Sequence, residues 1–445
     1  MIYANPKPYS LCMDIWTPAN ATDASKLPVK VWLFGGSNNG GSISAPLYDG
    51  CSLARDSIVV AINYRLGALG FLAYENAGLM GSYGIQDQLL ALTCIQEEIA
   101  SFGGDPDKVL LFGQSAGAFD AYVISSLPQA PSLFRAVASE SSGGHDLPEI
   151  VWTKPYYSRY IRDLGCSLDD ADATLKCLRS KSVAAMNETW MAEKRAGPSV
   201  LSASTFTQGN GIGNANLAVV DRNIVPENPG TVGARVPAIF GNMANDGSLG
   251  ILTHYGDSLV NITEADYDES LSVSFRPLAE TVKETYSWSA FEDASPYPGY
   301  TAMTTIITES SYKCPNYRAL KIAAEKGVDA WAYNFNHTSH CACGFDVPQS
   351  AKVLELLRAT HTGEVPYVFG QTHGLPRPAG NCNFTSAEVS ISDFMAKMWT
   401  SMASDGHPGN SSQWPAWTLN GSEGVVVKGC GQHRAAEFYR VCLLG

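Results

Sequence analysis

The sequence has few charged residues, no excess of basic ones and no long apolar run. Charged residues make up only 16% of its 445 positions, and acidic residues outnumber basic ones by 43 to 30. The formal net charge of −13 makes nucleic acid an unfavourable partner, because phosphate backbones are also anionic. No apolar run reaches the length of about 18 residues that a membrane-spanning helix needs. With 45% hydrophobic residues the chain can bury a large core, which excludes disordered and coiled-coil proteins.

A secretion signal is also missing, since the chain opens on a polar segment that contains proline. Eleven cysteines and several Asn-x-Ser/Thr sequons nevertheless favour an oxidising, glycosylating secretory route. The sequons begin at Asn20, Asn187, Asn261, Asn336, Asn383, Asn410 and Asn420. We therefore expect a secreted protein whose true N-terminus precedes residue 1, with a cytosolic protein as the alternative. The odd number of cysteines implies at least one free thiol.

Apolar, β-branched runs alternate with helical patterns in the first third of the chain. Residues 30–34, 57–64 and 108–112 are typical of buried strands. Between 85 and 99, apolar residues recur every three or four positions, as on one face of a helix, and a second helical pattern covers 116–126. Further strand candidates are residues 136–137, 236–240 and 330–335. This alternation predicts an α/β fold with a mostly parallel sheet covered on both faces.

Two segments do not follow this alternation. Residues 145–230 and 250–310 are more polar, less periodic and richer in Gly, Ser, Pro and Asn. We interpret them as less regular, cap-like excursions above the sheet rather than as independent domains. No internal repeat or low-complexity tract divides the chain, so we expect one domain over residues 1–445.

The sharpest local signal is the pentapeptide GQSAG at residues 113–117, between a strand pattern and a helical pattern. A serine in such a turn adopts strained backbone angles, so its neighbours must be small, as Gly113, Ala116 and Gly117 are. The pattern alone is weak, because glycine fills 41 positions and an ordinary glycine-rich turn would look similar. Its position between strand and helix predicts that Ser115 is a nucleophile.

A glycine-rich loop follows the strand predicted at 30–34. Acyl transfer needs N–H donors at the place where negative charge develops on the carbonyl oxygen. We predict that the backbone N–H groups of Gly36 and Ser37 form such an oxyanion hole, together with that of Ala116. A merely flexible loop at the strand end is the alternative.

Several long motifs, in order, resemble the type B carboxylesterase and cholinesterase family of α/β-hydrolases. They are NYRLGALGFL at 63–72, GIQDQLLAL at 84–92, FGGDP at 102–106, the segment around Ser115, and WTSMASDGHP at 399–408. The likeness runs from about Asp14 to the C-terminus and is weak at 180–230 and 255–310. It implies an α/β-hydrolase fold, with a mostly parallel central sheet flanked by helices and with cap-like insertions.

The resemblance also implies a catalytic triad in the order serine, acid, histidine. It places the acid at Asp246, where cholinesterases carry glutamate, and the histidine at His361. From the residues alone, Asp246 could be part of an ordinary Asp-Gly turn and His361 could be structural. Glu364 fits the same histidine motif, either bracing the site or as a buried structural carboxylate. His361 would take the proton of Ser115, Asp246 would orient the imidazole, and no metal or organic cofactor would be required.

Cysteine positions extend the resemblance. Cys166 and Cys177 resemble the family's short disulfide loop, and Cys314 and Cys442 its long-range pair, whereas Cys94 is expected to be a buried free thiol. Partners cannot be assigned to Cys12, Cys51, Cys341, Cys343, Cys382 and Cys430. The spacing of His337, His340, Cys341 and Cys343 could supply metal ligands, but the overlapping sequon and the nearby cysteines favour a disulfide or a surface loop.

The favoured function is that of a serine carboxylic-ester hydrolase that acts on a small-molecule ester. One alternative is a thioesterase, lactonase or acyl-transferring enzyme of specialised metabolism, with the same triad. A second is a non-catalytic adhesion or binding relative, although such relatives typically lose the nucleophile. Compared with the family the chain is shortened at its N-terminus, and the missing loop carries the choline-binding tryptophan of cholinesterases and the lid of lipases. Choline esters and triglycerides therefore gain no support, and the sequence does not specify the acyl group, the alcohol or the oligomeric state.

Overall fold

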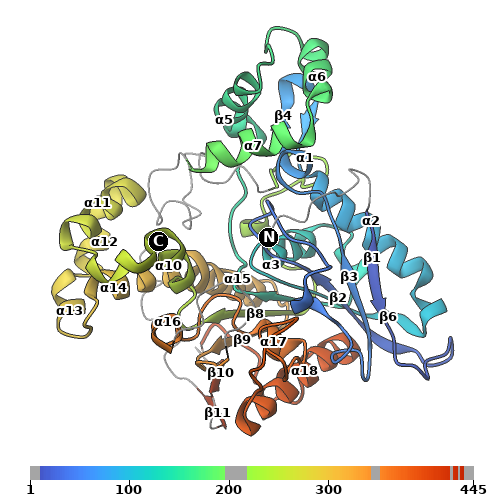
Figure 1. The fold of residues 1–445 in the computed structure, drawn as a ribbon. Helices are drawn as coiled ribbons and strands as arrows, with labels where there is room; N and C mark the ends of the chain where they lie inside the picture. Colours follow the sequence, from blue (N-terminus) through green and yellow to red (C-terminus); the bar gives the residue numbers. More distant parts are fainter. Residues whose placement is uncertain (1–10, 196–217, 342–350, 421–423, 429–430, 435–445) are drawn as a thin grey trace.

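The computed structural model describes residues 11–195, 218–341, 351–420, 424–428 and 431–434 (Figure 1). Within these residues, nine strands form one central sheet in the order β1-β3-β2-β6-β7-β8-β9-β10-β11. Their bounds are β1 (Met13–Trp16), β2 (Leu27–Leu33), β3 (Ile58–Ile62), β6 (Gly104–Gln114), β7 (Ala136–Glu140), β8 (Ala238–Met243), β9 (Ala330–Phe335), β10 (Val425–Lys428) and β11 (Gly431–Arg434). Only the outermost strands, β1 and β11, pair antiparallel with their neighbours, so the sheet is mostly parallel as predicted.

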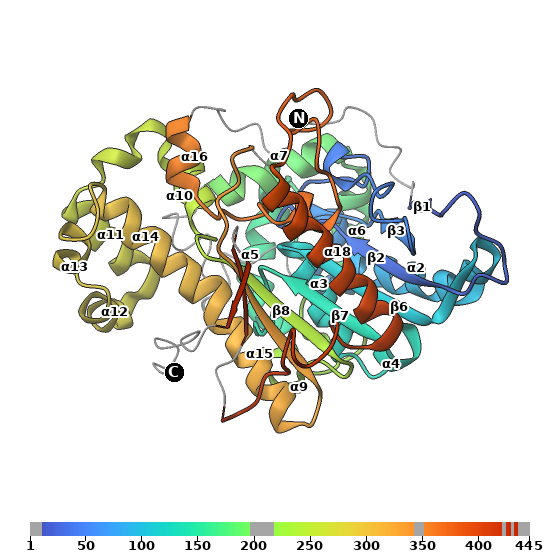
Figure 2. The same ribbon diagram turned by 90° about the horizontal axis from the view of Figure 1, so that it is seen from below.

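Helices cover both faces of this sheet (Figure 2). They are α2 (Tyr83–Glu98), α3 (Ala116–Ser126) and α15 (Cys314–Glu325) on one face, and α17 (Val365–Val368) and α18 (Ser386–Asp405) on the other. The side chains of β2 alternate between the two layers because successive residues of a strand point to opposite sides. Val29, Val31 and Leu33 pack towards α2 and α3, whereas Trp32 and Phe34 pack towards α17 and α18. The fold is that of an α/β-hydrolase.

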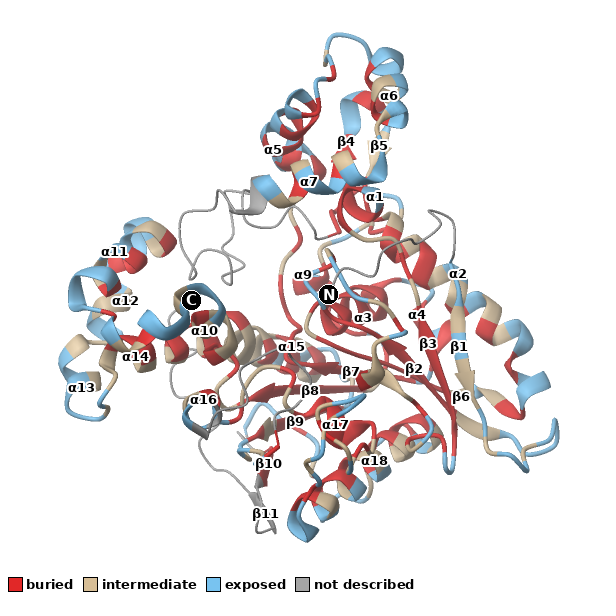
Figure 3. Ribbon diagram, viewed as in Figure 1, coloured by how far each residue is buried: buried red, intermediate tan, exposed pale blue. Residues whose placement is uncertain are grey.

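The segments expected to be irregular are mostly helical. The first contains α5 (Ile150–Asp163), α6 (Ala171–Ser180) and α7 (Val183–Arg195), which pack with the hairpin β4 (Ala73–Tyr74) and β5 (Leu79–Met80). The second contains α10 (Ser248–Tyr255), α11 (Glu264–Phe275), α12 (Ala279–Thr285), α13 (Trp288–Glu292) and α14 (Pro298–Ile307). Each group surrounds a small apolar cluster of its own and exposes its outer faces (Figure 3). Helices that are short and solvated on most sides carry few apolar positions, so their periodicity in the sequence is weak.

Two disulfides join described residues. Cys166 pairs with Cys177, as the resemblance suggested, and Cys341 pairs with Cys382. Cys314 is also disulfide-bonded, whereas Cys442 lies outside the described residues, as do Cys343 and Cys430. Cys12, Cys51 and Cys94 are free thiols, and Cys94 is half-buried rather than fully buried. The sulfur atoms of Cys341 and Cys382 lie close to a nitrogen of His340, but the disulfide joins the two thiols that a metal would need.

The asparagine of every sequon lies at the surface. The side chains of Asn20, Asn187, Asn261, Asn336, Asn383, Asn410 and Asn420 are exposed. Over the part of the chain that the structure describes, no helix has both the length and the apolar character needed to cross a membrane.

Candidate active site

Ser115 occupies the turn between β6 and α3. Its backbone angles, φ 58° and ψ −125°, are strained for a residue with a side chain. Its N–H donates to the carbonyl oxygen of Glu140 at 2.9 Å, which ties the turn to β7. A Cβ on Gly117 would lie 2.0 Å from the carbonyl oxygen of Leu33, so only glycine lets α3 approach the sheet this closely. The small residues of the motif therefore serve to present the Ser115 side chain, which is half-buried.

Asp246 and His361 are in direct contact. A β-bridge between Asn245 and Thr360 brings their two loops together. Oδ1 of Asp246 lies 2.8 Å from Nδ1 of His361, and its Oδ2 accepts a hydrogen bond from the N–H of Met243 at 2.7 Å. The Asp246 side chain is fully buried, and the His361 side chain is 12% exposed. The carboxylate assigns the ring proton to Nδ1, which leaves Nε2 as the proton acceptor.

Ser115 is linked to His361 through its neighbour in the chain. Nε2 of Gln114 lies 3.4 Å from Nδ1 and 3.3 Å from Nε2 of the imidazole, and the ring of Tyr312 has its centroid 5.0 Å from that of His361. Ser115 and His361, both in the described part of the chain, do not form a direct hydrogen bond. Such contacts are often long in a free enzyme and tighten when substrate binds.

The loop after β2 turns back against the serine. A Cβ on Gly35 would lie 2.9 Å from Cβ of Ser115, so the two backbones are close neighbours. Gly36 has φ 118°, and Ser37 and Asn38 both have φ 54°. The N–H of Asn39 donates to the carbonyl oxygen of Gly36 at 3.0 Å, which closes a turn around the two positive-φ residues. The loop after β2 therefore forms a hydrogen-bonded turn beside Ser115.

Two of the predicted oxyanion donors point to no protein acceptor among the described residues: the N–H groups of Gly36 and Ala116. Ala116 is the first residue of α3, where a helix leaves its N–H groups without an intrahelical partner. The positive end of the helix dipole lies at the same place. The arrangement suits negative charge next to Ser115.

Two further carboxyl groups are buried close to the candidate site. Oε1 of Glu364 accepts a hydrogen bond from Oγ of Ser141 at 3.4 Å, and Oε1 of Glu140 accepts one from Nε1 of Trp399 at 2.8 Å. Burial, with Asp246 nearby, raises the pKa of Glu364 to about 8. Burial, with Glu364 nearby, raises the pKa of Glu140 well above its ordinary value. Burial thus favours the protonated, neutral form of both carboxyl groups. Sequence reasoning found Glu364 but missed Glu140, which lies at the end of β7.

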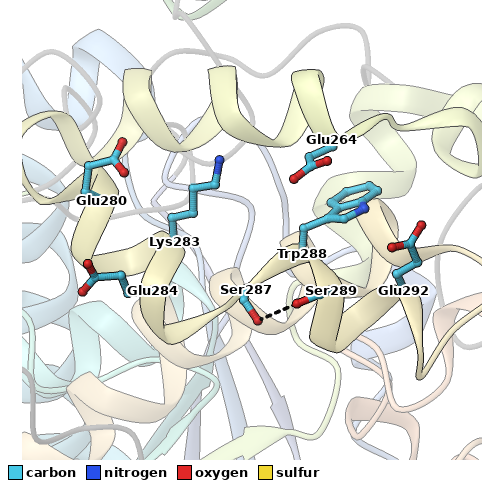
Figure 4. Close-up of a pocket in the computed structure, with 8 residues that line it drawn as sticks. All are labelled: Glu264, Glu280, Lys283, Glu284, Ser287, Trp288, Ser289 and Glu292. Atoms are coloured by element: carbon cyan, nitrogen blue, oxygen red, sulfur yellow. Dashed lines mark hydrogen bonds between the residues drawn. The ribbon is translucent and has the colours of Figure 1, made fainter.

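A separate hollow of about 540 Å³ lies on the outer group of helices, between α11, α12 and α13 (Figure 4). Its lining is Glu264, Glu280, Lys283, Glu284, Ser287, Trp288, Ser289 and Glu292. The ammonium group of Lys283 is already paired with Asp268 at 2.6 Å. This open acidic hollow contains none of the residues that sequence reasoning selected.

The sequence is similar to those of known proteins. Residues 10–430 match the model of a family described as the carboxylesterase family. The chain is 30% identical over 439 residues to the cholinesterase of Mus musculus, which covers 92% of this chain and 67% of that protein. It is 30% identical over 350 residues to the cAMP-regulated D2 protein of Dictyostelium discoideum, a match that covers 76% of this chain and 60% of that protein. It is 27% identical over 443 residues to the bile salt-activated lipase of Homo sapiens, a match that covers 93% of this chain and 55% of that protein. The chain thus spans between about half and two thirds of the length of these relatives.

Proposed function

The chain belongs to the carboxylesterase family, and from that premise we propose that it is a serine carboxylic-ester hydrolase. The observation that carries the proposal is the 2.8 Å contact between buried Asp246 and His361, next to a serine held in a strained strand-to-helix turn. This combination is what nucleophilic acyl transfer requires: a nucleophile, a base, and a carboxylate that orients the base. The function assigned to Ser115, Asp246 and His361 is part of the proposal.

In the first half of the reaction, Nε2 of His361 takes the proton of Ser115 as the serine oxygen attacks the ester carbonyl. Asp246 holds the proton on Nδ1 and stabilises the imidazolium that forms. The N–H groups of Gly36, Ser37 and Ala116 bind the oxyanion of the tetrahedral intermediate. Collapse of this intermediate returns the proton to the leaving alcohol and forms the acyl-enzyme.

In the second half, water attacks the acyl-enzyme while His361 again acts as the base, and the carboxylic acid leaves. The same residues could act on a thioester or a lactone in place of the ester. They could also transfer the acyl group to a second alcohol in place of water.

The experiment is hydrolysis of short-chain p-nitrophenyl esters by the purified protein, with Ser115→Ala as the inactive variant. Ser132→Ala, which removes an exposed serine hydroxyl on the short helix α4 (Ala130–Leu133), serves as the matched control. We expect turnover by the wild type and the control, and its loss in Ser115→Ala. A folded wild type that hydrolyses no ester, thioester or lactone would refute the proposal and would leave an acyl-transferring enzyme or a non-catalytic binding protein.

We also propose that the protein is made in the secretory pathway. The exposure of all seven sequon asparagines and the presence of disulfides support this proposal. Expression in a eukaryotic cell with a signal peptide, followed by enzymatic removal of N-glycans, tests it by mass. A protein whose mass does not change on deglycosylation would count against this route.

A further inference from the structure

A carboxylate is buried beneath the turn that carries the proposed oxyanion donors. Asp120 lies on α3, the helix that begins directly after Ser115, and its side chain is inaccessible to solvent. Its Oδ1 accepts a hydrogen bond from Nδ2 of Asn38 at 3.0 Å, and its Oδ2 accepts one from Nε2 of Gln88 at 2.7 Å. Both oxygens of the carboxylate are therefore used by side-chain amides.

Asn38, which follows Ser37 in the chain, is fixed at both its side chain and its main chain. Its Oδ1 lies 3.3 Å from the hydroxyl of Tyr64, which also donates to the carbonyl oxygen of Phe34 at 2.6 Å. Its own carbonyl oxygen accepts a hydrogen bond from the N–H of Gly67 at 2.7 Å. Asn38 is buried and has φ 54°, a conformation that asparagine adopts more readily than most residues. Hydrogen bonds thus hold the side-chain amide of Asn38 at a residue whose backbone has a restricted, positive-φ conformation.

The position of Asp120 is unfavourable for a charge. Its neighbours on α3, Ala118, Phe119, Ala121 and Tyr122, are all buried, so an apolar side chain would fit the environment better. Burial raises the pKa of Asp120 to about 7, although the hydrogen bonds from Gln88 and Asn38 oppose the rise. An apolar residue would avoid this penalty but would offer Asn38 no acceptor. The carboxylate of Asp120 instead gives Asn38 an acceptor, which fixes the turn at residues 36–39.

We propose that Asp120 is a positioning residue for the oxyanion hole, which through Asn38 holds the N–H groups of Gly36 and Ser37 in register with Ser115. Ser115 lies at the start of α3 and Asp120 further along the same helix. One rigid element thus sets the place of both the nucleophile and the turn. The inference rests on the proposed function and assigns a role to a residue outside the triad.

The consequence is a specific kinetic signature. The oxyanion forms only in the transition state, so a displaced hole lowers kcat and leaves KM nearly unchanged. Asp120→Asn puts an amide opposite two amide donors, and its single oxygen can serve only one of them. We expect kcat to fall by about 10- to 100-fold with KM within about two-fold of the wild type. The affinity for a trifluoromethyl ketone, which forms the same oxyanion on Ser115, should fall by a similar factor.

Exchange of the two partners separates positioning from mere folding. In the double variant Asn38→Asp with Asp120→Asn, the amide introduced at position 120 can donate to the new carboxylate and accept from Gln88. The hydrogen bond is then restored with its direction reversed, and most of kcat should return. Asp221→Asn is the matched control, because Asp221 is also buried but accepts from the N–H groups of its own turn. It should change stability without changing kcat per active site.

Active sites are counted by labelling with a fluorophosphonate, so that unfolded protein does not enter kcat. A normal kcat in Asp120→Asn overturns the inference, and so does a loss that the double variant fails to recover. A wild type that is labelled at Ser115 but hydrolyses no ester contradicts only the proposed function. The labelling rates of the variants then take the place of kcat, because the phosphonyl oxygen needs the same donors. A wild type that is not even labelled overturns both.

Discussion

The side-chain amide of Gln114 lies over the imidazole ring of His361. Its Nε2 is almost equidistant from the two ring nitrogens, at 3.4 Å from Nδ1 and 3.3 Å from Nε2. In the ring plane, a point at these distances would overlap ring atoms, so the amide nitrogen lies above the ring rather than along either lone pair. The contact is thus of the weak N–H to π type.

The first prediction concerns the charge at this contact. Gln114→Glu places a carboxylate over the imidazole and stabilises its protonated form, which cannot act as a base. The acid limb of the profile of kcat/KM against pH should move to higher pH by about one unit. The measurement is ester hydrolysis from pH 5 to 9. Gln129→Glu, which adds the same charge at an exposed position, should leave the limb in place. An unmoved limb in Gln114→Glu would show that the amide leaves the ring in the working enzyme.

The second prediction concerns the two oxygens of Asp246. One faces Nδ1 of His361 and the other accepts from the N–H of Met243 at 2.7 Å. In Asp246→Asn the single amide oxygen is drawn to Met243, which turns the NH₂ group towards Nδ1. The ring must then carry its proton on Nε2, where it cannot accept the proton of Ser115. We expect kcat to fall by about 10³- to 10⁴-fold. Asp246→Glu keeps a carboxylate and should retain clearly more activity; equal losses in both variants would argue against this tautomer explanation.

Much of the central fold could be predicted from the sequence because its signals are local. β2, β3 and β6 are buried on both faces, so they appear as continuous apolar runs. The turn at Ser115 is visible because a tight strand-to-helix connection requires small residues next to one another. β1, β10 and β11 were missed, since each has only four residues and lies at or near an edge of the sheet.

The contacts that tune the candidate site were not predictable in the same way. Asn38 and Asp120 are 82 positions apart, and Gln114 and His361 are 247 apart. Each residue taken alone is an ordinary polar residue in a loop or helix. Only the packing of α3 against the loop after β2 turns Asp120 into an acceptor for Asn38. A buried aspartate within an otherwise apolar helical run was the one local sign, and it does not name its partner.

The third prediction tests the close approach of α3 to the sheet. In Gly117→Ala the new methyl group would meet the backbone of Leu33, which cannot move without disturbing β2. We expect the free energy of unfolding to fall by about 1–3 kcal/mol or more, with a loss of activity because Ser115 is displaced. Gly250→Ala, on α10, meets no atom within 4 Å and should stabilise the protein by up to about 1 kcal/mol. The measurement is the free energy of unfolding of both variants in urea. An unchanged free energy of unfolding in Gly117→Ala would refute the steric argument.

The last prediction concerns Glu388, the buried carboxylate that caps α18. It accepts hydrogen bonds from the N–H and hydroxyl of Thr385 at 2.9 and 2.8 Å, and it faces His337 and His340 at 3.1 and 2.7 Å. The hydroxyl of Tyr367 donates to it at 3.2 Å. Burial alone would raise its pKa, but the hydrogen bonds from Thr385, His337 and His340 outweigh burial and lower the pKa to about 2. The folded protein therefore holds this carboxylate in its charged form.

Because the pKa of Glu388 is lowered in the folded state, its contribution to stability is present above the ordinary glutamate pKa and is lost as the pH falls towards 2. A lowering from 4.5 to about 2 corresponds to a contribution of about 3 kcal/mol at neutral pH. Glu388→Gln should remove most of it at pH 7 and should flatten the loss of stability between about pH 5 and pH 2. Urea midpoints measured across this range test the prediction, with Glu97→Gln on the exposed side of α2 as the control. If the stability of Glu388→Gln falls with pH as steeply as that of the wild type, the acid sensitivity of the fold has another source.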